Sequence, residues 1–247
     1  MISLSVNVNK IATLRNSRGG DIPNLLTFTK VIMDSGAHGI TVHPRSDERH
    51  ITRKDTKDLK KYILEYNKEY SKKIEYNIEG APDERFLDIV LENLPDQATL
   101  VPVRPGEVTS DHGFDLKKEG EMLYPLIQKI RSAGVRVSLF LDTNIDNMGY
   151  AKQIEADRIE FYTGPFAESF EAGKGVESFQ SYEKAALAAT KLGIGVNAGH
   201  DLDEKNLAIF KKLSGLREVS IGHRLMSFAL LHGMENAVKA YLKALSK

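Results

Sequence analysis

Cysteine is absent from the 247 residues of this chain. Disulfide bonds, thiolate metal ligands and a cysteine nucleophile are therefore excluded. The chain also lacks an excess of either charge, because lysine plus arginine and aspartate plus glutamate number 34 each. This balance gives no indication of a nucleic-acid or membrane partner, although a local basic cluster could still bind phosphate.

Long apolar runs are missing as well. No stretch approaches the roughly 18 apolar residues needed to cross a bilayer, and Met1–Asn7 lacks the basic region and apolar run of a signal peptide. We therefore expect a cytoplasmic protein. No Pro/Ser-rich linker or low-complexity tract divides the chain, so we expect residues 1–247 to form a single domain.

Recognisable metal and dinucleotide motifs are also lacking. The chain has no H-E-x-x-H, no paired carboxylate cage and no G-x-G-x-x-G fingerprint. In the segment His43-x-Arg45-x₄-His50, cations interleave with the histidines and would repel a divalent ion. The sequence therefore predicts no metal site.

What the chain does contain is a regular alternation of short, β-rich runs with helical patterns. The eight predicted strands are Leu4–Asn9, Gly39–His43, Lys73–Glu79, Ala98–Val103, Val135–Asp142, Arg158–Thr163, Ile194–Ala198 and Glu218–Gly222. Predicted helices are Pro23–Ser35, Lys54–Tyr66, Asp83–Asn93, Met122–Ile130, Asn144–Glu155, Ser181–Leu192, Asp203–Leu213 and Leu225–Leu245, the last split at Gly233. Eight such units predict a (β/α)₈ barrel, with an open doubly wound sheet as the alternative.

Glycines mark the joints between helices and strands. Gly36, Gly134, Gly193 and Gly215 each stand just before a strand, where a left-handed residue commonly ends a helix. Two loops, Lys10–Ile22 and Arg104–Asp115, are longer than a tight connection of about 2–6 residues. Long loops of this kind tend to be functional, and we expect the second to close over a site.

Titratable side chains gather where the predicted strands end. Five of the seven histidines lie at or after strand ends, and they are His43, His50, His112, His200 and His223. Alternation places Glu75, Asn77 and Glu79 on the lumen side of their strand. We interpret Glu75 as part of a structural polar network, and Glu79, at the rim, as a carboxyl able to exchange protons near neutral pH.

Phosphate binding is predicted at two places. Ser220-Ile221-Gly222-His223-Arg224 gives a strand, a glycine and a helix start, which is typical of the phosphate site of barrels. A second basic group consists of Arg15, Arg18, Arg45 and Arg49. Any one of these arginines could equally form a surface ion pair.

Several blocks of this sequence occur in the same order as in one known protein family. These blocks are Asn7–Asn16, Gly39–Arg45 with Arg49–Ile51, Glu107–Thr109, Val137–Phe140 and Asn197–His200. Together they resemble pyridoxine 5′-phosphate synthases from the first strand to the last. Two departures are clear: many relatives have Asp-His where this chain has Asn9-Lys10, and some have glycine where it has Asp201.

The resemblance implies a barrel with extra helices that condenses 3-amino-2-oxopropyl phosphate with 1-deoxy-D-xylulose 5-phosphate. It implies a transferase that needs no metal or organic cofactor and assembles as a homo-octamer built from dimers. It implies acid/base roles for His43, Glu79 and His200. The substrate-binding positions that it implies are Asn7, Asn9, Lys10, Arg18, Arg45, His50, Thr109, Asp201, Gly222 and His223.

The acid/base chemistry suits two histidines with pKa values near neutrality and one tunable carboxyl. Two alternatives stay open on the residues alone. One is another phosphosugar barrel, such as an isomerase or a synthase of indole or thiamine type. The other is a non-catalytic barrel that binds phosphorylated ligands, for which the Asn9-Lys10 departure is the only support.

Overall fold

The strands form a closed parallel barrel in the computed structural model, which describes residues 1–104, 107 and 110–246. In the described part of the chain the strands are β1 Ser3–Asn7, β2 Gly39–Val42, β3 Glu75–Gly80, β4 Gln97–Leu100, β5 Arg136–Leu141, β6 Arg158–Tyr162, β7 Gly195–Gly199 and β8 Leu216–Ile221. They pair in chain order, and β1 pairs with β8 through Ser3–Glu218 to Val6–Ile221. This closure confirms the (β/α)₈ barrel and rules out the open sheet.

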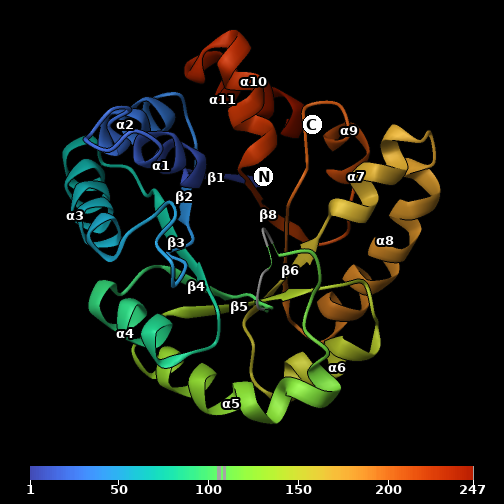
Figure 1. The fold of residues 1–247 in the computed structure, drawn as a ribbon. Coiled ribbons are helices and arrows are strands. Elements are labelled where there is room, and N and C mark those ends of the chain that lie inside the picture. Colours follow the sequence, from blue (N-terminus) through green and yellow to red (C-terminus); the bar gives the residue numbers. More distant parts are fainter. Residues whose placement is uncertain (105–106, 108–109, 247) are drawn as a thin grey trace.

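Helices surround the barrel, as Figure 1 shows in a view along its axis. They are α1 Asn9–Asn16, α2 Leu25–Asp34, α3 Arg53–Tyr70, α4 Glu84–Asn93, α5 Leu116–Ser132, α6 Asp146–Gln153, α7 Gly164–Glu171, α8 Gly175–Lys191, α9 Leu207–Phe210, α10 His223–His232 and α11 Met234–Leu245. None of these helices is long and apolar enough to cross a membrane. In the described part of the chain, the β1–β2 and β6–β7 connections and the segment after β8 each carry two helices, so the expected extra helices are present.

The predicted turn chemistry is confirmed at the helix-to-strand joints. Gly36, Gly134, Gly193 and Gly215 all have positive φ, from 73° to 103°. Gly233, also at positive φ, separates α10 from α11 as predicted. L-residues with a side chain rarely adopt this conformation, which explains why glycine recurs at these joints.

The first predicted strand and the loop after it differ from the structure. Strand β1 ends at Asn7, whose side-chain Oδ1 accepts a hydrogen bond from the backbone N–H of Asn9 at 3.0 Å. The chain turns there and enters α1, so the predicted loop Lys10–Ile22 is helical as far as Asn16. Helix α7, which begins with a Gly-Pro pair, was likewise not predicted.

The barrel lumen is polar along its length. On β3 the side chain of Asn77 bridges Thr41 and Thr99, at 3.3 and 3.0 Å. At the N-terminal end of the same strand, Glu75 accepts a 2.5 Å hydrogen bond from Arg136. The interpretation of Glu75 as part of a structural network is confirmed. Burial of these polar groups is tolerated because they are paired.

Arg15 is structural and does not face the pocket. Its guanidinium makes two hydrogen bonds, at 2.7 and 2.8 Å, to the carboxylate of Asp55 in the first turn of α3. The two side chains are only 10% and 12% exposed. Asp55 also completes a capping box with Thr52. The pair ties α1 to α3 beside His50, whose backbone carbonyl accepts from the same guanidinium at 3.4 Å.

Replacing Asp55 with alanine should lower the free energy of unfolding by about 3 kcal/mol, because Arg15 is left as a buried, unpaired charge. Chemical denaturation of wild type and variant measures the difference. The matched control is Asp58→Ala on the same helix, where the partner Lys54 is 82% exposed. The control should cost about 0.5 kcal/mol or less. Equal effects of the two substitutions would contradict the structural role.

Candidate active site

A pocket of about 420 Å³ opens at the carboxyl ends of the strands, where barrel enzymes carry their active sites. It brings together most of the residues proposed from the sequence: Asn7, Asn9, Lys10, His43, Arg45, His50, Glu79, His200, Asp201, Gly222 and His223. Arg18 is exposed and does not line this pocket. Thr109 lies outside the described residues, so its predicted role is untested.

Glu79 lies near the end of β3 and points into the pocket. Its Oε2 accepts a hydrogen bond from the Asn7 side chain at 3.3 Å and lies 4.0 Å from His43 Nδ1. Burial raises the pKa of this carboxyl from 4.5 to about 8, against the opposing effect of a hydrogen bond from Ser220. At neutral pH the group is therefore mostly protonated, yet close enough to its pKa to give and take protons.

A second buried carboxyl, Glu160 on β6, was missed by the sequence reading. The side chain lines the pocket, and its Oε2 lacks a hydrogen-bond partner among the described residues. Burial, followed by the negative charges of Glu79 and Glu218, raises the pKa of Glu160 well above its ordinary value. Alternation within Arg158–Tyr162 places Glu160 on the lumen side and could have revealed it.

Glycine at position 199 makes room for Glu160. A Cβ on Gly199 would collide with the Glu160 carboxyl and would stand 3.0 Å from the Ser220 carbonyl. Both neighbours belong to the strands that flank this part of the lumen. The Asn-Ala-Gly-His segment at the end of β7 therefore admits the carboxyl as well as presenting His200 to the pocket.

His43 and His50 are neutral at physiological pH. Burial, with smaller effects from His50 and Arg45, lowers the pKa of His43 to about 3. Burial and the charges of Arg45 and Lys10 lower the pKa of His50 to about 4. The expectation of two pKa values near neutrality is thus wrong for His43. A neutral imidazole can still accept a proton from a bound substrate that brings negative charge beside it.

Cationic groups line one side of the pocket and a helix start lines another. Lys10 lies in the first turn of α1, and Arg45 and Arg49 lie in the loop between β2 and α3. At the end of β8, which pairs with β1, Gly222 is the N-cap of α10 and His223 its first residue. Backbone N–H groups at a helix start favour anions, so both sides of the pocket suit phosphorylated ligands.

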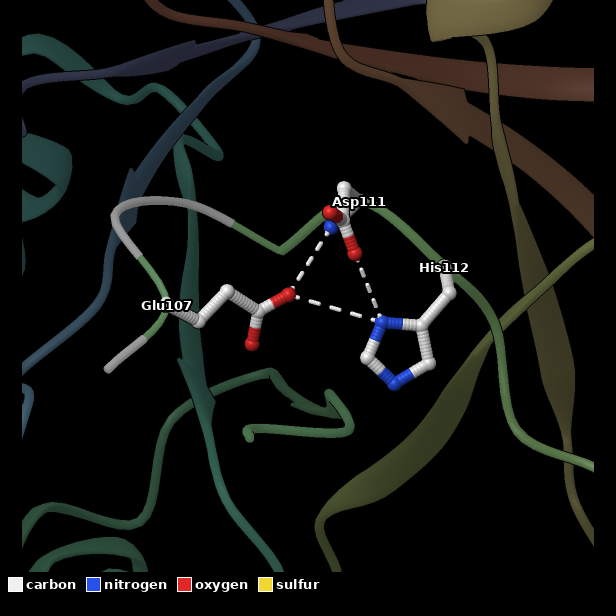
Figure 2. A group of neighbouring side chains, drawn as sticks. All are labelled: Glu107, Asp111 and His112. Atoms are coloured by element: carbon white, nitrogen blue, oxygen red, sulfur yellow. Dashed lines mark hydrogen bonds and ion pairs between the residues drawn. The ribbon is translucent and has the colours of Figure 1, made fainter. Parts of the chain in front are cut away.

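The loop between β4 and α5 carries a cluster of its own. Figure 2 shows His112 Nδ1 near two carboxylates, at 2.9 Å from Asp111 and 3.4 Å from Glu107. The ligand atoms of all three residues lie within 4.8 Å of one another, close enough to hold a cation. The same geometry also arises without a cation, if His112 carries its proton on Nδ1 and donates it to the carboxylates. The Glu107 carbonyl accepts from Arg45 at 3.1 Å, which connects this loop to the pocket.

A closed parallel barrel with titratable side chains converging at its C-terminal rim defines a (β/α)₈-barrel enzyme. Residues 4–247 match the model of one family, described as "Pyridoxal phosphate biosynthesis protein PdxJ". The chain belongs to this family, and its activity is that of a pyridoxine 5′-phosphate synthase.

Curated relatives share this name. A pyridoxine 5′-phosphate synthase of Leptospira biflexa is 57% identical, covering 100% of this chain and 98% of the relative. One from Flavobacterium johnsoniae is 48% identical, covering 99% of this chain and 100% of the relative. The resemblance found in the sequence is confirmed.

Solved structures that share the fold are much more distant in sequence. A thiamine phosphate pyrophosphorylase of Pyrococcus furiosus has a TM-score of 0.60 at 12% identity, covering 99% of this chain and 95% of that one. A 3-keto-L-gulonate-6-phosphate decarboxylase of Vibrio cholerae has a TM-score of 0.63 at 8% identity, with 98% and 97% covered. These likenesses show the barrel fold alone.

Glu79→Gln should flatten the dependence of stability on pH. The raised pKa means that the folded protein keeps a proton that the unfolded chain releases above about pH 4.5, so the free energy of unfolding falls as pH rises toward 8. The wild-type Tm should therefore drop more steeply between pH 5 and 8 than that of the variant. Exposed Glu121→Gln should follow the wild type. Parallel profiles for wild type and Glu79→Gln would contradict a protonated, buried Glu79.

Proposed function

We propose that the pocket condenses 3-amino-2-oxopropyl phosphate with 1-deoxy-D-xylulose 5-phosphate to give pyridoxine 5′-phosphate, inorganic phosphate and water, as a transferase. The observation that carries the proposal is the pair of buried carboxyls, Glu79 and Glu160, beside neutral histidines. The condensation forms one C–N and one C–C bond and expels water and phosphate. Each of these steps moves a proton, and none requires a redox carrier.

Glu79 is proposed to shuttle protons during imine formation and enolisation. With a pKa of about 8 it can protonate a departing hydroxyl and, once ionised, remove a proton from carbon. His43, neutral and 4.0 Å from Glu79 Oε2, serves as the base near ring closure. His200 protonates the departing phosphate. Glu160, protonated, offers a hydrogen bond to a polar group of the bound intermediate.

Substrate binding divides between the two sides of the pocket. Arg45 and His50, with Lys10, hold one phosphorylated substrate on the cationic side. Gly222 and His223 cradle a phosphate at the start of α10. Holding both substrates together makes ring formation effectively intramolecular and lowers its entropic barrier. Lys10, in place of the more common histidine, contributes a fixed positive charge.

The direct test mixes the purified protein with both substrates and follows phosphate release and pyridoxine 5′-phosphate formation together. Wild type should form product, and Glu79→Gln should lower kcat by about 100-fold or more, because general acid–base groups contribute on that scale. Glu121→Gln is the control and should match the wild type. Intact substrates after incubation with wild type would refute the proposal, and binding of product without turnover would favour the non-catalytic barrel.

We also propose that the chain assembles as a homo-octamer built from dimers and works in the cytoplasm. Leu230 and Leu231 on α10 are 82% and 83% exposed, which is unusual for adjacent leucines and supports a covered surface. Analytical ultracentrifugation should give a particle of eight chains, and Leu230→Lys together with Leu231→Lys should yield smaller species. A wild-type monomer at micromolar concentration would contradict the assembly.

A further inference from the structure

The chain adopts an unfavourable backbone conformation at the catalytic histidine. His200 and the following Asp201 have φ values of 84° and 59°, in the left-handed region that side chains other than glycine rarely adopt. Consecutive residues of this kind cost energy and persist where other contacts hold them. Glycine, present at position 201 in some relatives, would take the conformation without that cost.

The Asp201 side chain makes a contact that glycine could not. Its Oδ2 lies 2.9 Å from His200 Nδ1, and its Oδ1 lies 3.8 Å from Nε of Arg224. The hydrogen bond from His200, aided by the charges of His200 and Arg224, holds the pKa of Asp201 below its usual range despite partial burial. The carboxylate is therefore ionised and can only accept, so His200 Nδ1 carries the proton.

Surrounding groups hold the histidine in this arrangement. Thr163 Oγ1 donates to the carbonyl of His200, and Asn206 Nδ2 donates to the carbonyl of Asp201 at 3.1 Å. The ring of Tyr162 meets the imidazole edge-on, with 5.2 Å between the ring centroids. These contacts hold the backbone at His200 and Asp201 and the orientation of the imidazole ring. The Asp201 carboxylate then selects the tautomer.

We propose that Asp201 is a positioning residue that holds the proton on Nδ1 of His200, so that Nε2 is the nitrogen that exchanges protons with the substrate. This rests on the proposed function of His200 as proton donor. During turnover Nε2 first takes up a proton, which makes His200 an imidazolium. It then gives that proton to the oxygen of the departing phosphate as the C–O bond breaks, which returns the ring to the neutral Nδ1–H tautomer of the resting protein. The assignment differs from the substrate-binding role that the family resemblance implied for position 201.

The first test separates positioning from a structural role. Asp201→Gly removes the carboxylate and the backbone cost together, so kcat should fall about tenfold while both KM values stay within about twofold and Tm is unchanged or higher. Asp201→Asn keeps an acceptor oxygen and tolerates left-handed backbone, so its kcat should lie between the two. Glu171→Gln removes the other carboxylate on Arg224 without touching His200 and should leave kcat unchanged.

The second test needs no turnover. ¹⁵N NMR of the resting wild-type protein should show His200 as the Nδ1–H tautomer, and Asp201→Gly should shift the population toward Nε2–H. An Nε2–H tautomer in wild type, or an Asp201→Gly kcat within about twofold of wild type, would overturn the proposal. If wild type forms no product but shows the Nδ1–H tautomer, the proposed function fails while the positioning of His200 stands.

Discussion

Burial of two carboxyl groups in the lumen is the constraint on which the site depends. Glu79 and Glu160 stand in a barrel whose interior is largely polar, and burial raises the pKa of both carboxyls. Ionising one raises the cost of ionising the other, because like charges repel strongly where the dielectric constant is low. The pair thus holds protons at neutral pH that ordinary glutamates release.

The rest of the structure supports those two side chains. Below them, hydrogen bonds such as that between Arg136 and Glu75 at the N-terminal end pair most of the polar side chains that fill the lumen. Gly199 leaves space for Glu160, and Asn7 bonds to Glu79. On the outside, the Arg15–Asp55 pair fastens α1 to α3 and so fixes the segment that presents His50. The same contacts thus stabilise the fold and hold the residues of the site in place.

Periodicity and turn chemistry made most of the fold predictable. The glycines at the joints and the β-rich runs located all eight strands to within a few residues, and strand ends located His43, Glu79 and His200. Helix α1 was missed because Asn9 continues the alternation of β1 by sequence, whereas a hydrogen bond from the Asn9 backbone N–H to the Asn7 side chain turns the chain. Arg15 looked like a phosphate ligand because its partner, Asp55, lies 40 residues away in sequence. The depressed pKa of His43 and the role of Asp201 depend on burial and tertiary contacts, which no local pattern encodes.

Direct titration of the Glu79 carboxyl tests the central claim, that burial keeps this group protonated at neutral pH. Infrared difference spectra of isotope-labelled wild type and Glu79→Gln, recorded across pH in the absence of substrate, isolate the signal of this one side chain. We expect a protonated carboxyl at pH 7 that ionises with a midpoint of about 8. A carboxylate already ionised at pH 5 would contradict it.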